Sequence, residues 1–153
     1  MPDGETGAVA ESIEETLARV PLLSRLGRRQ RARLASFAVS HRFREGATIV
    51  REGDTSMSLY VVLTGRVRVE RENGAVQMGE LGPGGCFGEM GLIEDMPRSA
   101  TVVALEPTQC ALLAKWDFQN ELREDPDIAL ALLPVLTARI RRLDARLAVA
   151  ETA

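Results

Sequence analysis

Between residues 47 and 81 apolar and polar side chains alternate with a period of two, and this pattern restricts the possible folds more than any other feature. Val67 and Val69 alternate with charged residues, as in a strand with one buried and one solvent-facing side. Asn73-Gly74 separates two such runs and is a strong signal for a hairpin turn. The chain is therefore expected to build antiparallel strands joined by short turns.

Two more strands are expected further along the chain. Residues 99–105 and 108–115 are rich in β-branched and apolar residues, and they flank the turn signal Glu106-Pro107. Together the strands predict a barrel-like antiparallel roll over about residues 43–115. The open end of such a roll is a suitable place for a small ligand.

Helical spacing of apolar residues appears on both sides of the predicted roll. Residues 11–20 and 28–39 are each expected to form a short helix. The apolar residues that define them are Ile13, Leu17 and Val20 in the first and Leu34, Phe37 and Ala38 in the second. After residue 117 the pattern returns to helix, so the order is helices, strands, helices.

The last helix is predicted to be long, over about residues 126–149. Asp125-Pro126 offers an N-cap residue followed by proline at the first helical position. Pro134 should kink this helix or confine regular helix pairing to the residues after it. An apolar stripe recurs along it with steps of four and three, at Ile128, Leu132, Leu136, Ile140, Leu143 and Leu147. The stripe either packs on its own roll or pairs with a second helix, and we favour a homodimer through residues 132–147.

The expected fold class is therefore α+β: an antiparallel, jelly-roll-like β-roll with helices before it and one long helix after it. The chain has 153 residues, of which 45% are hydrophobic and 27% charged, so it is sized for one globular domain. No apolar run approaches the roughly 18–20 residues of a transmembrane helix, and the acidic residues 1–15 do not resemble a signal peptide. We expect a cytoplasmic protein without a membrane partner, with residues 1–12 as a flexible acidic tail.

Charge and the reactive residue types exclude several other functions. Cys86 and Cys110 lie in apolar strand patterns without metal-like spacing, so we expect two reduced thiols and no metal site. His41 is the only histidine and lies far from other candidate groups, so we do not expect an enzyme. The net charge of −3 argues weakly against a dedicated nucleic-acid binder. Two arginine clusters on expected helices are interpreted as solvated faces: Arg28, Arg29, Arg31 and Arg33, and Arg139, Arg141, Arg142 and Arg146.

One short connection, residues 87–102, combines groups that suit an anion and a sugar. Gly88 lets the backbone approach a ligand closely, and amides at the start of a short helical turn over residues 89–92 point toward an anion. Arg98 adds a fork of donors for a phosphate, to which the Ser99 hydroxyl and the Ala100 amide also donate. Glu89 only accepts hydrogen bonds when ionised, so it suits a sugar hydroxyl. An ordinary surface ion pair between Glu89 and Arg98 is the alternative.

The string Phe87-Gly88-Glu89-Met90-Gly91-Leu92 with Pro97-Arg98-Ser99-Ala100-Thr101-Val102 resembles the phosphate-binding cassette of cyclic nucleotide-binding domains. That family includes the catabolite activator protein and the regulatory subunits of protein kinase A. The resemblance covers about residues 20–147. It continues in the strings Phe43-Arg44-Glu45-Gly46, Ile49-Val50-Arg51-Glu52-Gly53-Asp54, Leu59-Tyr60-Val61-Val62-Leu63-Thr64-Gly65-Arg66-Val67-Arg68-Val69 and Leu81-Gly82-Pro83-Gly84-Gly85-Cys86. It implies that residues 13–153 form a cyclic nucleotide-binding domain.

The resemblance also implies which residues surround the rest of the nucleotide. The expected pocket wall is Phe87, Val69, Met78 and Gly79, although Val69 and Met78 suit ordinary core packing equally. On the long helix, Leu143 and Asp144 align with two small polar residues that contact adenine in activator-type proteins, and both differ from that pattern. Ser99 after Arg98 resembles the cAMP-type arrangement, so cAMP is the expected ligand and cGMP the alternative.

The implied function is that of a cyclic nucleotide sensor acting by an allosteric population shift. Activator-type relatives continue into a winged helix-turn-helix, whereas the sequence ends at Ala153, so we expect no such DNA-binding domain within these residues. It is expected to be either a stand-alone module acting on an unknown partner or the ligand-binding part of a Crp/Fnr-type transcription regulator. The alternative function is a ligand-free interaction and dimerisation module that has lost the nucleotide.

Overall fold

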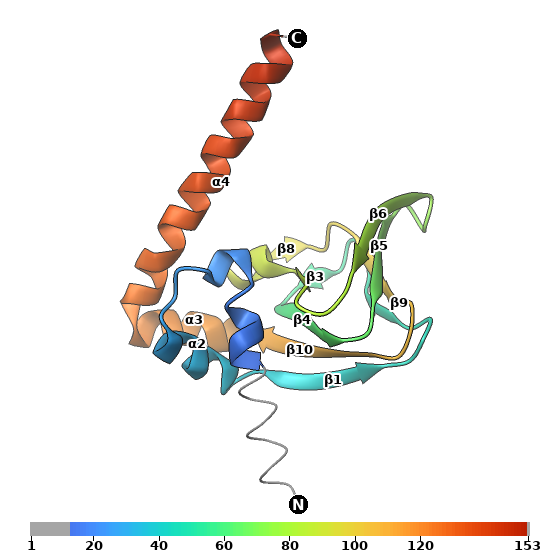
Figure 1. Ribbon diagram of the computed structural model, residues 1–153, viewed down its shortest axis with the longest axis horizontal. Helices are drawn as coiled ribbons and strands as arrows, with labels where there is room; N and C mark the ends of the chain where they lie inside the picture. Colours follow the sequence, from blue (N-terminus) through green and yellow to red (C-terminus); the bar gives the residue numbers. More distant parts are fainter. Residues whose placement is uncertain (1–12, 153) are drawn as a thin grey trace, which may run out of the picture.

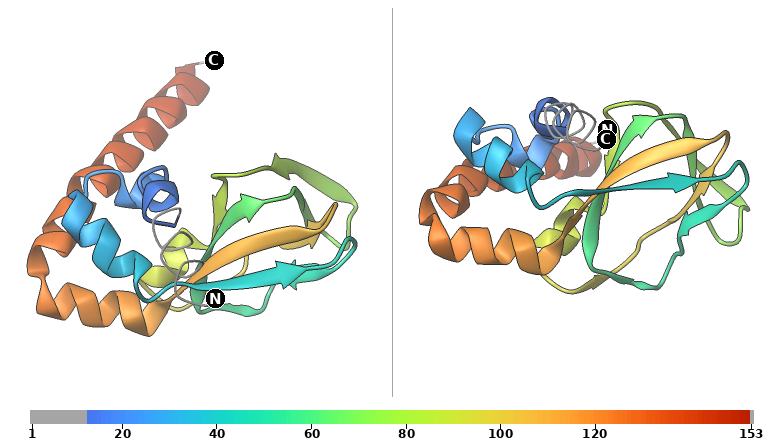
Figure 2. Two further views of the ribbon diagram at one scale, coloured as in Figure 1. Left: turned by 60° about the horizontal axis from the view of Figure 1, so that its bottom comes forward. Right: turned by 90° about the horizontal axis from the view of Figure 1, so that it is seen from below.

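The computed structural model describes residues 13–152 and shows a β-roll with helices gathered at one of its ends (Figures 1 and 2). The predicted acidic tail, residues 1–12, lies outside the described residues. Residues 13–17 are helical, and the 3-10 turn η1 (Pro21–Leu23) and helix α2 (Arg28–Ala35) follow. After the roll come α3 (Lys115–Glu124) and the long α4 (Pro126–Thr152). The predicted α+β class and the order of its parts are confirmed.

The roll consists of two four-stranded antiparallel sheets and one two-stranded ribbon. Its strands are β1 (Val39–Phe43), β2 (Thr48–Val50), β3 (Thr55–Ser56), β4 (Ser58–Thr64), β5 (Val67–Arg71), β6 (Val76–Leu81), β7 (Cys86–Phe87), β8 (Met96–Pro97), β9 (Thr101–Ala104) and β10 (Thr108–Ala114). The first sheet has the order β1-β10-β4-β7, the second β2-β9-β5-β6, and the ribbon pairs β3 with β8. The roll thus begins before residue 43, because Val39 already pairs with Leu112.

The predicted hairpin at Asn73-Gly74 joins β5 to β6. Glu72, Asn73 and Gly74 all have positive φ angles, of 55°, 55° and 90°. The Gly74 amide donates to the Arg71 carbonyl at 3.2 Å, which closes the turn. Three successive residues with positive φ angles reverse the chain here, whereas the sequence indicated a turn of two residues.

The second N-terminal helix is shorter than the sequence indicated. It ends at Ala35, whereas the predicted helix extended to residue 39. The Ser36 hydroxyl donates to the Arg33 carbonyl at 2.6 Å, and Val39 is drawn into the ladder with β10. Strand pairing with a distant segment therefore outweighs the local helical spacing at residues 36–39.

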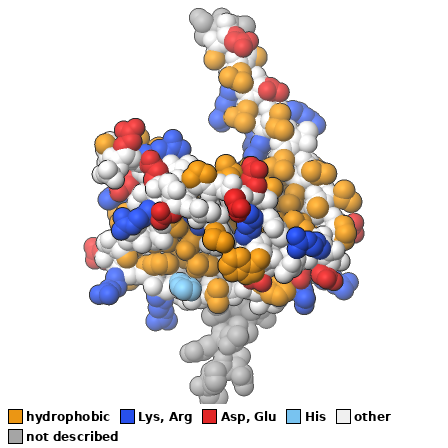
Figure 3. Space-filling model, turned by 180° about the vertical axis from the view of Figure 1, so that it is seen from behind, with side chains coloured by type: hydrophobic (Ala, Val, Ile, Leu, Met, Phe, Trp, Pro, Cys, Tyr) orange, Lys and Arg blue, Asp and Glu red, His pale blue; other side chains and the backbone are white. Residues whose placement is uncertain are grey.

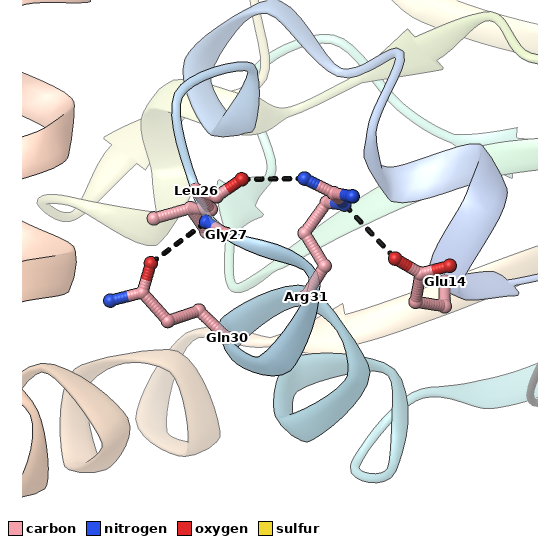
Figure 4. Close-up of polar contacts among 5 residues, drawn as sticks. All are labelled: Glu14, Leu26, Gly27, Gln30 and Arg31. Carbon is pink, nitrogen blue, oxygen red and sulfur yellow. Dashed lines mark hydrogen bonds and ion pairs between the residues drawn. The ribbon is translucent and has the colours of Figure 1, made fainter.

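The arginines of α2 are not all solvated. Arg31 is partly buried: its Nη1 donates to the Leu26 carbonyl at 2.5 Å and its Nε to Glu14 at 3.1 Å (Figure 4). It therefore links α2 to the preceding turn and to the helical residues 13–17. Arg33 pairs with the buried Glu121 of α3 at 3.1 Å. The interpretation of a solvated face holds for Arg28 and Arg29, which are exposed, and is wrong for Arg31.

Two apolar clusters form the interior. The larger joins the N-terminal helices, α3 and the start of α4 to one face of the first sheet, and Phe118, Leu17, Leu59 and Leu113 lie at its centre. The smaller fills the roll itself: Val62, Val67, Val102 and Cys110. The helices thus rest on the outside of the roll, and one end of the roll remains available for a site.

Helix α4 begins as predicted and then leaves the rest of the molecule (Figure 1). The Asp125 side chain accepts a hydrogen bond from the Asp127 amide at 3.2 Å, which is the expected N-cap contact next to Pro126. The helix is continuous through Pro134. Ile128 and Leu132 are buried on the domain's own core, whereas all side chains from 140 to 151 are exposed. The predicted apolar stripe therefore divides into an inner and an outer part.

Candidate functional site

A cavity of about 340 Å³ lies between the end of β7, the turn that follows it, and the start of β9. Such a volume is in the range of small-ligand sites. Apolar side chains and a few polar groups line it. They are Val50, Ser56, Val69, Phe87, Gly88, Glu89, Met90, Gly91, Met96, Pro97, Arg98, Ser99, Ala100 and Val102. Residues from both sheets and from the β3-β8 ribbon thus meet at one end of the roll.

Arg98 is the cation of this cavity and is only 9% exposed. Its backbone N–H donates a hydrogen bond to the Asp54 carbonyl at 2.6 Å, and its Nη2 donates to the Ser58 carbonyl at 3.0 Å. The guanidinium lies over the Tyr60 ring at 5.3 Å from the ring centroid. Burial lowers the pKa of Arg98 from its ordinary value, and the neighbouring Tyr60 opposes this effect. Since an arginine pKa starts far above neutral pH, the site retains a desolvated positive charge.

Glu89 opens the 3-10 turn η2 (Glu89–Leu92) directly after Gly88, whose φ is 83°. Its Oε1 accepts a hydrogen bond of 2.6 Å from Arg139 Nη2, so α4 holds this carboxylate from outside the roll. Arg139 Nη1 also contacts Met90 Sδ at 3.4 Å. The Glu89 and Arg139 side chains are 20% and 25% exposed, so the ion pair is well shielded from solvent. The carboxylate is thereby oriented with one oxygen toward α4 and the other free.

Three buried polar atoms of the cavity have no hydrogen-bond partner within the described residues: Glu89 Oε2, Arg98 Nη1 and Ser56 Oγ. Buried polar atoms are nearly always paired in folded proteins, because an unpaired one costs roughly 1–3 kcal/mol. All three belong to residues that line the same cavity. The arrangement offers a carboxylate acceptor, a cationic donor and a hydroxyl to one bound molecule. A ligand with an anionic group, a hydroxyl donor and an apolar or ring-shaped body satisfies this set.

The structure brings most of the predicted site residues together. Gly88, Glu89, Arg98, Ser99 and Ala100 line the cavity, as do Phe87 and Val69. The exposed Met78 and Gly79, on β6, do not line it. Leu143 and Asp144 lie on the exposed part of α4, and Leu143 lines a separate hollow of about 250 Å³ with Arg139, Arg142 and Arg146. Ligand contact by Met78, Gly79, Leu143 and Asp144 stays a prediction.

Two polar side chains at the site were not predicted from the sequence. Ser56 lies on β3 and reaches the cavity because β3 pairs with β8, just before Arg98. Arg139 lies fifty positions after Glu89 in the chain and belonged to a cluster interpreted as solvated. Its partly buried ion pair shows that this interpretation is wrong for Arg139. The local sequence around either residue carries no signal for these contacts.

Within residues 13–152 no group of three or more histidine, cysteine or acidic side chains is placed to hold a metal ion. Cys86 and Cys110 are free thiols. The pKa of both is raised to about 11: burial is the cause for Cys110, and for Cys86 burial is the larger cause, to which the Glu89 carboxylate adds and which Arg139 opposes. In the same part of the chain, no helix has the length and apolar character that crossing a membrane requires.

Comparisons with known proteins identify one family. The family model described as "Cyclic nucleotide-binding domain" matches residues 40–125. The chain is 34% identical over 109 residues to the cAMP-dependent protein kinase regulatory subunit of Colletotrichum orbiculare, covering 71% of this chain and 28% of that protein. It is 37% identical over 106 residues to the Cyclic AMP receptor protein of Thermus thermophilus, covering 67% of this chain and 49% of that protein. The chain thus spans half or less of these two relatives.

Solved structures show the same fold. The N-terminal domain of a transcriptional regulator from Streptomyces coelicolor A3(2) has a TM-score of 0.79 and 32% identity, over 86% of this chain and 93% of that one. The Thermus thermophilus Catabolite Activator Protein has a TM-score of 0.68 and 31% identity, over 86% of this chain and 63% of that one. Both likenesses extend beyond the residues that the family model matches.

Proposed function

This chain belongs to the cyclic nucleotide-binding domain family, and from that premise we propose that it is a regulatory domain that senses a cyclic nucleotide, with cAMP as the ligand. The observation that carries the proposal is the set of three unpaired buried atoms in one cavity. A cyclic phosphate supplies the anion, and the free ribose hydroxyl supplies the donor.

The proposed contacts follow from the chemistry of each group. Arg98 Nη1 donates to a phosphate oxygen, with support from the Ser99 hydroxyl and the Ala100 amide at the same edge of the cavity. Glu89 Oε2 accepts the hydrogen bond of the ribose hydroxyl. Val69 and Phe87 contact the sugar and base as apolar walls. Two of the three buried atoms that are unpaired without a ligand, Arg98 Nη1 and Glu89 Oε2, thereby gain partners, which favours binding.

The output is proposed to pass through α4. Glu89 contacts the ligand on one side and Arg139 of α4 on the other, so ligand contacts bias the position of the helix. An effector domain or partner protein in the cytoplasm then responds to the helix arrangement, as a transcription regulator of the Crp/Fnr type would. Coupling of this kind requires only that the ligand bind one helix arrangement more tightly than another.

We also propose that the protein acts as a homodimer through α4. Ile140 and Leu147 are 59% and 60% exposed on the outer part of the helix. Hydrophobic side chains are visible at the surface of the part of the molecule that projects from the roll (Figure 3). Since neither packs on the domain's own core, Ile140→Glu with Leu147→Glu should leave the fold intact and convert a dimer to a monomer in light scattering. A wild-type chain that is monomeric at about 100 µM, a weak affinity for an obligate pair, would contradict dimerisation.

The proposed ligand is tested by calorimetric titration of the wild-type chain with cAMP and then with cGMP. Arg98→Ala should weaken binding by at least roughly thirtyfold, because a buried charged donor is lost and the phosphate remains underpaired. Arg66→Ala is the matched control: this arginine is half exposed, pairs with Glu80 and lies outside the cavity. Tighter binding of cGMP would reassign the base preference. Binding of neither nucleotide would favour the ligand-free interaction module.

A further inference from the structure

Of the three unpaired buried atoms at the cavity, Ser56 Oγ is the one that gains no partner from the contacts proposed above. Ser56 is only 3% exposed, and its Oγ has no hydrogen-bond partner within the described residues. A hydroxyl donates one hydrogen bond and accepts two, so burying it without a partner is unfavourable. Because Ser56 lines the cavity, a bound molecule is in a position to supply that partner.

The β3-β8 ribbon places Ser56 and Arg98 on one face of the same short pair of strands (Figure 1). Ser56 pairs with Met96, and the pairing extends to Asp54, whose carbonyl accepts the Arg98 amide hydrogen bond at 2.6 Å. Opposed residues share a face of a strand pair, and so do residues two positions apart, so Ser56, Met96 and Arg98 share one face. All three line the cavity. Diagonal neighbours of this kind are about 7–8 Å apart, which is within reach of a long side chain.

The turn η2 lies against both donor groups. A Cβ atom at Gly91 would collide with Ser56 Oγ, as one at Gly88 would collide with Arg98 Nη1. The two glycines are three residues apart, which is one turn of a 3-10 helix, or about 6 Å along its axis. The serine hydroxyl and the guanidinium therefore lie along the same turn, at neighbouring positions on one wall of the cavity.

The unpaired atoms also show which groups the Ser56 hydroxyl does not serve. Glu89 Oε2 is a buried acceptor and Ser56 Oγ a buried donor, and both are unpaired, so these two atoms are not within hydrogen-bond distance of each other. The hydroxyl therefore needs an acceptor that a ligand brings to the Arg98 side of the cavity. An anion held by Arg98 is the strongest such acceptor, because hydrogen bonds to a charged oxygen are shorter and stronger than neutral ones.

We propose that Ser56 Oγ donates a hydrogen bond to one of the two phosphate oxygens outside the cyclic ring, while Arg98 Nη1 donates to the other. This contact rests on the function proposed above and adds a ligand-binding residue from β3 to those of the cassette. A phosphodiester has two free oxygens on one phosphorus atom, so it pairs both donors at once. Ser56 thereby favours a phosphodiester over a group with a single acceptor atom at this place.

Ser56→Ala separates a ligand contact from a structural role, because the two roles predict opposite changes. Without ligand, the variant should raise the Tm by about 2–4 °C, since a buried hydroxyl without a partner is removed. With cAMP, it should weaken binding in calorimetric titration by about threefold to tenfold. Thr55→Val is the matched control: Thr55 is exposed, lies on the other face of the same strand and does not line the cavity. It should leave the affinity for cAMP unchanged.

The two diastereomers of the cyclic phosphorothioate analogue of cAMP identify the phosphate oxygen. Each carries sulfur, a weak hydrogen-bond acceptor, in place of one of the two oxygens outside the ring. Both should bind the wild type more weakly than cAMP does. Ser56→Ala should shrink this difference by at least about threefold for one diastereomer and leave it unchanged for the other, because one oxygen has lost its donor. Thr55→Val should change neither difference.

Each alternative gives a different result. A lower Tm in Ser56→Ala, with equal losses for cAMP and both analogues, would show a structural hydroxyl and overturn the contact. An unchanged Tm with unchanged affinity would show that a buried water satisfies the hydroxyl, with the same consequence. A smaller preference for cAMP over 2′-deoxy-cAMP in Ser56→Ala would assign the hydroxyl to the ribose and overturn the phosphate contact.

Failure of the Ser56 contact is distinguishable from failure of the proposed function. A wild type that binds cAMP, with an affinity that Ser56→Ala does not weaken, would contradict the Ser56 contact alone. A wild type that binds neither cAMP nor cGMP would contradict the proposed function and the contact together.

Discussion

Arg98 extends its guanidinium into the space that a side chain at position 88 would fill. A Cβ atom at Gly88 would collide with Arg98 Nη1 and would approach the Ser58 carbonyl oxygen to 2.8 Å. Gly88 also has a φ of 83°, a conformation that L side chains rarely adopt. Position 88 therefore requires glycine for two reasons: the turn before η2 needs a positive φ, and the Arg98 guanidinium occupies the space that a Cβ atom would fill.

Gly88→Ala should reduce nucleotide affinity by at least roughly tenfold, because Arg98 must move from its position beside the phosphate. Gly53→Ala is the matched control, since Gly53 has a φ of 91° but no atom lies within 4 Å of its Cβ position. Both variants should lose about 1 kcal/mol of unfolding free energy from backbone strain, and Gly88→Ala should lose more than Gly53→Ala because of the close approach to the Ser58 carbonyl oxygen. Urea unfolding and calorimetry check the two effects. Equal binding losses in both variants would mean that strain, and not the Arg98 clash, is responsible.

Glu89→Gln should weaken cAMP binding less than Arg98→Ala does, since an amide oxygen still accepts the ribose hydrogen bond while a charge-assisted contact is lost. The wild type should prefer cAMP to 2′-deoxy-cAMP, and this preference should shrink in Glu89→Gln. Competition titrations with the two nucleotides measure it. An undiminished preference would assign the ribose contact to another residue, and a greater loss than in Arg98→Ala would reverse the two roles.

Arg139→Gln should loosen the connection between α4 and the roll. The ion pair with Glu89 is well shielded, so its loss should cost up to about 1 kcal/mol and let the Glu89 carboxylate turn. We expect faster hydrogen exchange in α4 after residue 136 and several-fold weaker nucleotide binding. Arg142→Gln is the control, since Arg142 makes no ion pair within the described residues. Equal exchange in both variants would contradict the role of the Glu89–Arg139 pair.

The two thiols should react slowly with alkylating reagents at pH 8 in the folded protein. Burial raises the pKa of Cys86 and of Cys110 to about 11, so only a small fraction is thiolate at that pH. Because the folded-state pKa lies above the unfolded value, stability from this source is complete below about pH 8.5 and is lost as the pH rises toward 11. Alkylation rates and urea unfolding between pH 7 and about 11 measure both effects. Rapid alkylation of the native chain at pH 8 would contradict the burial.

Glu89→Gln connects the thiols to the site. The Glu89 carboxylate raises the pKa of Cys86, so its neutral replacement should lower that pKa and speed alkylation of Cys86. Cys110 serves as the internal control, because burial is the cause of its raised pKa. The relative rates of the two thiols, compared by mass spectrometry, report the change.

Local signals in the sequence determined much of the fold. The period of two and the Asn73-Gly74 turn predicted the β5-β6 hairpin, and Asp125-Pro126 predicted the start of α4. These features depend on neighbouring residues, whose conformational preferences are encoded within a few positions. The cavity residues Gly88, Glu89 and Arg98 could also be predicted from the sequence, because they lie with their neighbours in one short stretch of the chain.

Tertiary structure alone decided the features that depend on distant segments. α2 ends at Ala35 because β1 pairs with β10, and Ser56 joins the cavity because β3 pairs with β8. Ile128 and Leu132 pack inward while Ile140 and Leu147 remain exposed, although all four share one sequence period. The sequence around Arg139 is that of a solvated helix face, and only the fold places Glu89 beside this arginine. Local preference fixes backbone conformation, whereas the partners of a side chain are fixed only when remote parts of the chain pack together.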